Sequence, residues 1–315
     1  MVAGEYERPP LMWNRHLETI FPATFRITPA PPYERERIPT PDGDFLDLDW
    51  VHRGPEHLLI ISHGLEGNSQ RPYVRGLVRA FAAPGWSVLA WNYRGCGGEM
   101  NRQRRFYHSG ATDDLATVVD HAASRHFRHI SLVGFSLGGN LTLKYLGEPR
   151  PRPASLRRAV AFSVPLHLHS SCLELIRPHN WLYNTNFLIS LRKKIRLKAA
   201  QYPDIDLRPL KKITNLFQFD DVYTGPLHGF SDAADYYERS SSLQFLPGIS
   251  IPAKIINARN DPFLSARCFP APTEYQNPQV QTTYPMLGGH VGFAQFGSKG
   301  LYWSELKTLE FLVHD

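Results

Sequence analysis

The pentapeptide Gly-Phe-Ser-Leu-Gly at residues 134–138 constrains the fold of this chain more than any other feature. It follows an apolar run at 130–133 and precedes a helix-like segment at 140–146. A serine between two glycines at such a junction is typical of a nucleophile elbow, a sharp strand-to-helix turn that exposes the hydroxyl. We therefore predict that Ser136 is a nucleophile at the end of a strand.

A serine hydroxyl is a weak nucleophile, so it needs a base and an orienting acid. In chains with a nucleophile elbow, the acid follows the serine and the histidine follows the acid. Asp261 and His290 fit that order. Asp261 follows a strand-like run at 253–257 and precedes a proline, whereas His290 follows a run at 280–284 and lies among glycines that permit a tight turn. We expect His290 to move the proton of Ser136 and Asp261 to fix the imidazole tautomer.

The oxyanion of the tetrahedral intermediate also needs donors. We expect the backbone N–H groups of Leu137 and Leu65, because Leu65 lies in a loop that follows the apolar run at 58–62. His63 is a second candidate base, but it precedes the serine, so a structural hydrogen bond is the expected role. Gly-x-Ser-x-Gly alone occurs by chance, and Asp261 alone could be a turn aspartate. The joint occurrence of the motifs, each after its own strand, favours catalysis.

Strand-like and helix-like segments alternate along most of the chain and predict an α/β fold with a mostly parallel sheet covered by helices on both faces. Runs at 35–38 and 46–50 flank an Asp-Gly turn and predict an antiparallel hairpin at the sheet edge. Further strands are expected at 57–62, 86–91, 130–133, 156–163, 253–257 and 279–284, and helices at 73–82, 111–124 and 302–313. The first 34 residues are proline-rich, and we expect them to wrap the core irregularly.

The alternation stops between residues 165 and 249, which predicts a cap inserted between two parts of the core, 1–164 and 250–315. This segment is rich in aromatic residues. Most should form its own core, and about a third should face the cleft as an apolar lining. The aromatic residues in question are Trp181, Tyr183, Phe187, Phe217, Phe219, Tyr223, Phe230, Tyr236 and Tyr237.

Charge offers few clues to partners. The 315 residues carry a formal net charge of +6, with 20% charged and 42% hydrophobic residues, an ordinary globular composition. A basic cluster at 192–198 has the apolar spacing of an amphipathic helix. We expect it to form a solvated face, with peripheral contact to an anionic membrane as the alternative. No nucleic-acid signature accompanies it.

Metal, cofactor and membrane signals are missing from the sequence. Its three cysteines form no C-x-x-C pair, and its histidines form no H-E-x-x-H motif, so neither a metal nor a cofactor is expected. The amino terminus has no apolar signal region, and no run of about 18 apolar residues occurs. These absences predict a cytoplasmic protein without an integral membrane span.

Longer motifs extend the elbow into a family resemblance. They are Trp-Asn-Arg-His-Leu-Glu-Thr-Ile at 13–20, His-Gly-Leu-Glu-Gly at 63–67, Tyr-Arg-Gly-Cys-Gly-Gly at 93–98, Tyr-His-Ser-Gly at 107–110, Phe-Asp-Asp at 219–221, His-Gly-Phe at 228–230, Asp-Tyr-Tyr at 235–237, Asn-Asp-Pro at 260–262 and Gly-Gly-His-Val-Gly-Phe at 288–293. With them the chain resembles, nearly end to end, α/β-hydrolases of the YheT-like family of hydrolases and esterases. The resemblance implies the α/β-hydrolase fold and the triad Ser136, Asp261 and His290.

The chain departs from the family in two ways. Asn260 stands where relatives often have a second aspartate, which leaves Asp261 as the acid of that loop. Eukaryotic relatives often have an amino-terminal membrane anchor that this sequence lacks, so their lipid substrates do not transfer directly.

The expected activity is hydrolysis of small carboxylic esters with a short to medium acyl chain, through an acyl-enzyme on Ser136. Thioesterase, lipase, amidase and acyltransferase activities use the same triad and remain alternatives, since a fold alone does not decide function. A catalytically inactive binding protein that kept the hydrolase fold is the alternative outside enzymes. Haloalkane dehalogenase and epoxide hydrolase chemistry is disfavoured, because those branches use an aspartate nucleophile.

Overall fold

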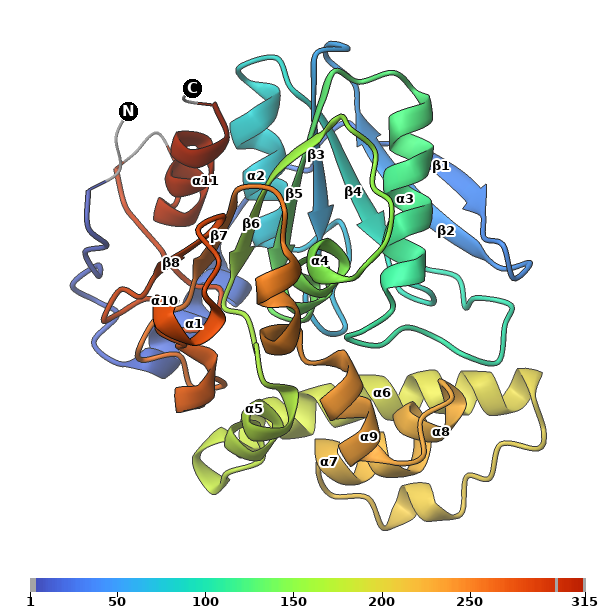
Figure 1. Cartoon of the computed structure of the whole chain (residues 1–315). Coiled ribbons are helices and arrows are strands. Elements are labelled where there is room, and N and C mark those ends of the chain that lie inside the picture. Colours follow the sequence, from blue (N-terminus) through green and yellow to red (C-terminus); the bar gives the residue numbers. More distant parts are fainter. Residues whose placement is uncertain (1–3, 298–299, 314–315) are drawn as a thin grey trace.

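The computed structural model describes residues 4–297 and 300–313, which build one eight-stranded sheet with the order β1-β2-β4-β3-β5-β6-β7-β8 (Figure 1). Strands β3 to β8 pair in parallel, whereas β2 is antiparallel to both β1 and β4. The strands are β1 (Glu34–Pro39), β2 (Phe45–Val51), β3 (His57–Ser62), β4 (Ser87–Asn92), β5 (His129–Phe135), β6 (Leu156–Phe162), β7 (Ala253–Ile256) and β8 (Val280–Thr283).

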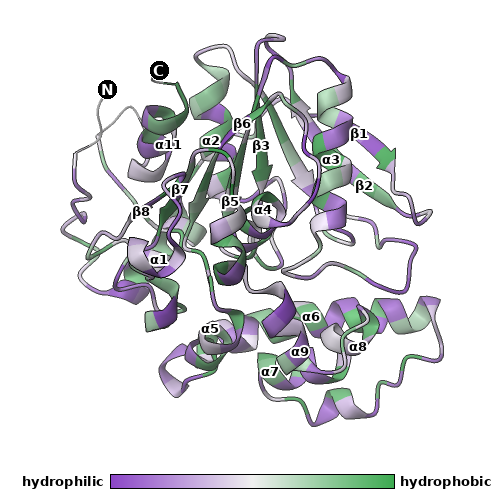
Figure 2. Ribbon diagram, viewed as in Figure 1, coloured by the Kyte–Doolittle hydropathy of each residue, from purple (hydrophilic) through white to green (hydrophobic). Residues whose placement is uncertain are grey.

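These strands confirm the predicted α/β architecture, with its parallel sheet and antiparallel edge hairpin. In the hairpin, Ile38 of β1 pairs with Leu46 of β2. Gly43 turns the chain between them with a φ of 78°, a conformation that glycine adopts without steric cost. Central strands such as β3 are hydrophobic along their length (Figure 2), as expected for strands that are covered on both faces.

Helices cover both faces of the sheet. On one face, α2 (Pro72–Ala82) packs against β4 and against α11 (Trp303–Val313), which also contacts β6. On the other face lie α3 (Thr112–Ser124) and α4 (Leu137–Gly147), which contact each other. The short helices η5 (Ala266–Cys268) and α10 (Pro272–Tyr275) follow β7.

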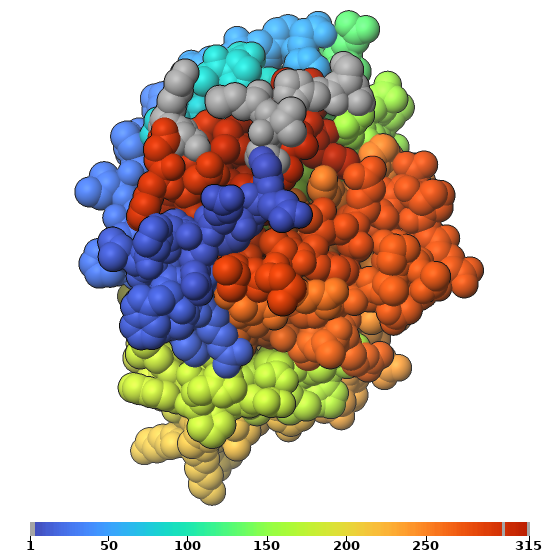
Figure 3. All heavy atoms as spheres, turned by 90° about the vertical axis from the view of Figure 1, so that its left-hand side faces the viewer, coloured from blue at the N-terminus to red at the C-terminus, as the bar shows by residue number. Residues whose placement is uncertain are grey.

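The amino-terminal segment is not irregular throughout, so that prediction is wrong in part. Residues Arg15–Phe25 form α1, which is capped by Asn14 because its side-chain oxygen accepts from the amides of His16 and Leu17. Pro22 lies inside this helix, and the proline content had obscured the helical pattern. Figure 3 shows the amino-terminal segment, in blue, packed over the carboxyl-terminal part of the chain, in orange and red.

Between β6 and β7 the chain forms a helical insertion, which lies beyond the carboxyl ends of the parallel strands (Figure 1). Its elements are α5 (Leu168–Leu175), η1 (Pro178–Asn180), α6 (Trp181–Gln201), η2 (Pro209–Lys211), α7 (Leu216–Phe219), η3 (Asp220–Thr224), α8 (Gly225–Leu227), α9 (Ala233–Ser240) and η4 (Ser242–Gly248). The element η3 is a π-helical turn, and such turns are frequent at functional sites.

The basic cluster on α6 is only partly solvated, which corrects the prediction of a solvated face. Lys193 and Arg196 are exposed, but Lys194 is 5% exposed and Lys198 is fully buried. Lys198 donates to the carbonyl of Asn101 at 2.7 Å, and burial lowers the pKa of its ammonium to about 8. Lysines four residues apart therefore attach this helix to the core. Among the described helices, none combines the length and apolarity needed to cross a bilayer.

Candidate active site

Ser136 lies in a strained turn between β5 and α4. Its φ is 53°, in the left-handed region that a residue with a side chain rarely adopts, and its amide donates to the carbonyl of Phe162 at 2.8 Å. The flanking glycines make this turn possible: a Cβ on Gly138 would collide with the carbonyl of Ser62, and one on Gly134 would collide with Gly138 itself. The local sequence thus presents the hydroxyl at the end of the sheet.

The structure brings the three predicted triad residues together. His290 Nε2 lies 2.9 Å from Ser136 Oγ, and His290 Nδ1 lies 2.8 Å from Asp261 Oδ2. Asp261 is 3% exposed, and its other oxygen accepts from the amide of Phe263 at 2.8 Å. The Phe263 ring lies against the imidazole, with a centroid distance of 4.2 Å. This chain of contacts has the geometry by which a histidine removes a serine proton while a carboxylate fixes its tautomer.

Helix α1 holds the histidine loop in place, a role that the sequence reasoning did not assign. The amide of His290 donates to Thr19 Oγ1 at 3.0 Å, and the amide of Gly288 donates to Glu18 Oε2 at 3.0 Å. Glu18 is fully buried. The sequence signal for this role of α1 is the long motif at 13–20, because it contains polar residues that the predicted triad does not use.

The contacts of Asn260, the residue before Asp261, explain why this position has an amide and not a second carboxylate. Its Nδ2 donates to Glu18 Oε2 at 2.6 Å, and its Oδ1 accepts from the amide of Gly289 at 3.1 Å. A carboxylate at this position would place a second negative charge against the buried Glu18. Asn260 therefore connects α1 to both loops that carry the acid and the base, while Asp261 alone reaches His290.

The predicted oxyanion donors lie beside the serine. Leu65 and Leu137 both line a pocket that also contains Ser136. Within residues 4–297 and 300–313, no acceptor binds the backbone N–H of Leu65 or of Leu137. Backbone N–H groups without partners, on two residues that line the same pocket as a serine hydroxyl, suit a developing negative charge on a carbonyl oxygen.

A buried polar cluster fixes the loop that carries Leu65. Glu66 has a φ of 51°, and its Oε1 accepts from Lys194 Nζ at 2.8 Å and from the Tyr107 hydroxyl at 2.7 Å. The Tyr107 hydroxyl in turn accepts from the Glu66 amide at 2.8 Å. Because Lys194 belongs to α6, the helical insertion is bonded directly to the loop of the candidate oxyanion donor.

His63 occupies the structural position that its sequence context predicted. It is 1% exposed, its Nδ1 donates to the Gly64 carbonyl at 2.8 Å, and its Nε2 accepts from the Tyr93 amide at 3.3 Å. Burial lowers the pKa of this imidazole to about 3, so it stays neutral. Its ring packs on Tyr93 with a centroid distance of 3.8 Å. Both ring nitrogens are used, and His63 supports the fold of the loop.

Two pockets meet at Ser136. The inner pocket has a volume of ≈ 120 Å³ and runs beneath the helical insertion, lined mainly by apolar side chains. The outer pocket has a volume of ≈ 400 Å³ and runs between α1 and the start of α6. Both contain Ser136, His290, Leu65, Phe187 and Phe263. Two compartments that join at a nucleophile suit the two halves of an ester.

Four of the nine aromatic residues named in the insertion line these pockets: Tyr183, Phe187, Tyr236 and Tyr237. The others serve different purposes; Phe219 and Tyr223 are buried, whereas Trp181 is 64% exposed. Pocket residues that the sequence reasoning missed include Phe106, Tyr107, Phe263 and Asp220. Among the described residues, no group of three or more histidine, cysteine or acidic side chains is arranged to hold a metal ion.

Sequence comparison places the chain among hydrolases. A family model described as "Serine aminopeptidase, S33" matches residues 53–204. "Putative esterase YheT" of Escherichia coli is 37% identical over 89% of this chain and 84% of its own length. "Phospholipase ABHD3" of Mus musculus is 30% identical over 90% of this chain and 72% of its own length. "Monoacylglycerol lipase" of Saccharomyces cerevisiae is 28% identical over 90% of this chain and 68% of its own length.

Solved structures share the architecture. The esterase Pf2001 of Pyrococcus furiosus superposes with a TM-score of 0.61 at 18% identity, covering 91% of this chain and 95% of that one. An esterase of Exiguobacterium antarcticum superposes with a TM-score of 0.56 at 15% identity, covering 90% of this chain and all of that one. At these identities the match establishes the fold and nothing finer.

Proposed function

We propose that this chain cleaves carboxylic esters through an acyl-enzyme, because it belongs to the α/β-hydrolase superfamily. Within that superfamily it belongs to the YheT-like family of esterase- and lipase-like serine hydrolases. The observation that carries the proposal is the chain of contacts from Asp261 through His290 to Ser136 Oγ. In this mechanism His290 removes the serine proton, Ser136 Oγ bonds to the carbonyl carbon, and the negative charge moves to the carbonyl oxygen.

The amides of Leu65 and Leu137 would then hold that oxyanion. Collapse of the intermediate breaks the bond to the alcohol, which leaves with the proton from His290 Nε2. Water, deprotonated by the same nitrogen, attacks the acyl-enzyme and releases the acid and Ser136. Asp261 keeps its charge throughout and stabilises the imidazolium.

The two pockets receive different parts of the ester in this proposal. Leu137, a proposed oxyanion donor, lines the inner pocket only, whereas Val291 and Gly292, which follow the base, line the outer pocket only. The leaving alcohol must lie next to His290 to receive its proton, and we assign it to the outer pocket, which also contains the two residues that follow His290. The acyl chain occupies the inner pocket, whose ≈ 120 Å³ favours a short to medium chain.

Residues 165–249 act as a cap over this site in the proposal, inserted between core segments 1–164 and 250–315. Phe187 and Leu191 of α6 and Leu168 of α5 contribute to the inner pocket. In the proposal these apolar side chains reduce the amount of water around the acyl group.

The relatives named as phospholipase and monoacylglycerol lipase raise long-chain lipid esters as the competing substrate class. A panel of p-nitrophenyl esters from acetate to palmitate separates the two. We expect the highest kcat/KM between about four and eight acyl carbons and a steep decline beyond them. Ser136→Ala should abolish turnover while thermal unfolding shows an intact fold. Highest activity with palmitate would favour the lipase, and no turnover of any ester by the folded protein would contradict ester hydrolysis.

A further inference from the structure

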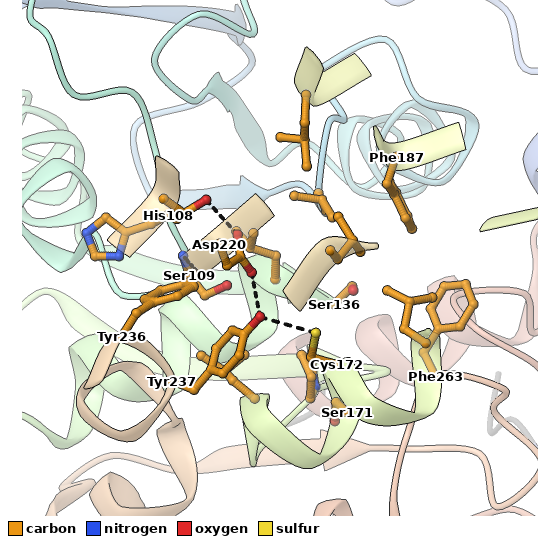
Figure 4. A pocket seen from close by; sticks show the side chains of 18 of the residues that line it. His108, Ser109, Ser136, Ser171, Cys172, Phe187, Asp220, Tyr236, Tyr237 and Phe263 are labelled. Carbon is orange, nitrogen blue, oxygen red and sulfur yellow. Dashed lines mark hydrogen bonds between the residues drawn. The ribbon is translucent and has the colours of Figure 1, made fainter. Parts of the chain in front are cut away.

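The inner pocket holds a polar group that the proposed hydrolysis does not use. Ser136 and His290 lie where this pocket meets the outer one, and Asp220, Thr224 and Tyr237 of the helical insertion line it as well. Figure 4 shows Asp220 and Tyr237 on one side of the cavity and Phe187 and Phe263 on the other. An acidic side chain within a mainly apolar chamber needs a physical reason, because burying a charge without a partner is costly.

Asp220 accepts hydrogen bonds from two hydroxyl groups. Its Oδ1 accepts from Thr224 Oγ1 at 2.5 Å, and its Oδ2 accepts from the Tyr237 hydroxyl at 2.7 Å. Within the described parts of the chain, no lysine, arginine or histidine forms an ion pair with this carboxylate. Burial raises its pKa to about 6. A carboxylate accepts about four hydrogen bonds, so two acceptor positions remain.

The donors of Tyr237 and Cys172 are already committed. The Tyr237 hydroxyl has one hydrogen, which the Asp220 carboxylate receives, so the Cys172 thiol, 3.2 Å away, is left to donate to the Tyr237 oxygen. Burial raises the pKa of this thiol to about 12, so it keeps its hydrogen. Neither group has a further hydrogen for Asp220, so a molecule in the pocket can donate to its free acceptor positions.

The backbone is built to present this group. Asp220 and Thr224 are the first and last residues of the π-helical turn η3, which sets their side chains together. The adjacent Asp221 serves a different purpose, because its Oδ1 accepts from the amide of Ala233 at 3.2 Å and it does not line the inner pocket. The motifs at 219–221 and 235–237 are thus joined by the hydrogen bond between the Tyr237 hydroxyl and the Asp220 carboxylate.

We propose that the inner pocket binds a hydroxyl group at the far end of a short acyl chain, and that this hydroxyl donates to the Asp220 carboxylate. The proposal rests on the proposed ester hydrolysis and specifies its substrate class as esters of hydroxy acids. A neutral hydroxyl suits the site better than an ammonium, because the surrounding wall is mainly apolar and removal of a cation from water costs several kcal/mol.

The small volume of the inner pocket favours a short chain. This pocket measures ≈ 120 Å³ against ≈ 400 Å³ for the outer pocket, so we expect only a few methylene groups between the ester carbonyl and the hydroxyl. Esters of 4-hydroxybutanoic to 6-hydroxyhexanoic acid are of this kind. Apolar side chains such as Leu168, Leu175 and Leu191 would contact the methylene groups, and the hydroxyl at the chain end would meet Asp220.

The test compares ethyl 6-hydroxyhexanoate with ethyl heptanoate, in which a methyl group replaces the hydroxyl. We expect the wild-type protein to favour the hydroxy ester by about tenfold or more in kcat/KM, the usual effect of a hydrogen bond to a charged group. Asp220→Leu should reverse this preference, and the isosteric Asp220→Asn should weaken it if the leucine variant does not fold. Asp221→Asn is the matched control and should keep the preference.

Three outcomes would overturn the hydroxyl assignment: equal or better hydrolysis of ethyl heptanoate by the wild type, an unchanged preference in folded Asp220→Leu, or faster hydrolysis of ethyl 6-aminohexanoate than of the hydroxy ester. Binding separates this proposal from the hydrolysis itself. The Ser136→Ala variant should show a larger thermal shift with ethyl 6-hydroxyhexanoate than with ethyl heptanoate, whether or not the wild type cleaves either ester. Equal shifts would contradict the hydroxyl site.

Discussion

The sheet core and the helical insertion each bring one carboxylate to the neighbourhood of the inner pocket, and the two are held differently. Asp261, from the core, contacts an imidazole and a backbone amide. Asp220, from the insertion, contacts two hydroxyl groups and forms no ion pair with any residue that the structure describes. The first carboxylate bonds to a protein side chain that we propose is the base, whereas the second has acceptor positions that we propose a ligand fills. In these two proposals, the core carries out the chemistry and the insertion contributes to substrate recognition.

The largest expected effect is the difference in kcat between variants of the two carboxylates. Asp261→Asn should lower kcat for p-nitrophenyl butyrate by about 10³- to 10⁴-fold, because the imidazole of His290 loses the negative charge that orients it and fixes its tautomer. Asp220→Asn should change kcat for this ester, which has no terminal hydroxyl, by less than about fivefold. Steady-state kinetics on both variants measure the contrast. Near-normal turnover in folded Asp261→Asn would refute its role as the acid.

The next effect tests the junction between the two regions. Lys194→Met should destabilise the fold by about 3 kcal/mol, because it removes the ammonium that pairs with Glu66 and leaves that carboxylate without its cation. Lys193→Met on the exposed side of α6 is the control, and it should change the free energy of unfolding by less than about 0.5 kcal/mol. Urea unfolding of both variants gives the comparison, and equal stabilities would show that the ion pair contributes nothing.

A pH series tests the unusual carboxylate of the insertion. The pKa of Asp220 is raised from 3.8 to about 6 in the folded state, so folding favours its protonated form. Its contribution to stability is therefore complete below about pH 4 and is lost as the pH rises through about 6. Relative to Asp220→Asn, the wild-type free energy of unfolding should fall by about 2 to 3 kcal/mol between pH 4 and pH 7. A difference that stays constant with pH would contradict the raised pKa.

The smallest expected effect concerns the support that α1 gives the core. Thr19→Val removes the acceptor for the His290 amide and should lower kcat about tenfold with little change in KM, since the base is less well held. Thr117→Val is the control, because its hydroxyl bonds only the exposed carbonyl of Asp113. Equal kcat values for Thr19→Val and the wild type would show that α1 does not position the base.

The sequence predicts the core far better than the insertion, for a physical reason. Strands and helices of the core have apolar periods of their own, and the triad residues follow strand ends whose order is set by the fold. The π-helical turn and the inner pocket depend on side chains from several elements that meet only in three dimensions. Asp220 was visible as part of a motif, but nothing near it in sequence shows that Tyr237 and Cys172 surround it.

The amino-terminal helix and the basic cluster show the same limit. Proline is unusual inside a helix, so Pro22 led to the prediction of an irregular segment where α1 forms. This helix contacts the loops of both Asp261 and His290. Lys194 and Lys198 fit a solvated amphipathic face by sequence, yet acceptors on the core, the Glu66 carboxylate and the carbonyl of Asn101, draw them into the interior. Local patterns indicate which residues are polar, but long-range partners decide which of them are buried.

Mass spectrometry after treatment with a fluorophosphonate tests the central claim most directly. The activated Ser136 Oγ should bond to phosphorus with loss of fluoride, giving one adduct per chain on the peptide that contains residues 134–138. His290→Ala should slow this labelling strongly, because the hydroxyl then lacks its base. An adduct on any other residue, or no adduct on folded wild-type protein, would contradict the account of Ser136, His290 and Asp261 as a catalytic relay.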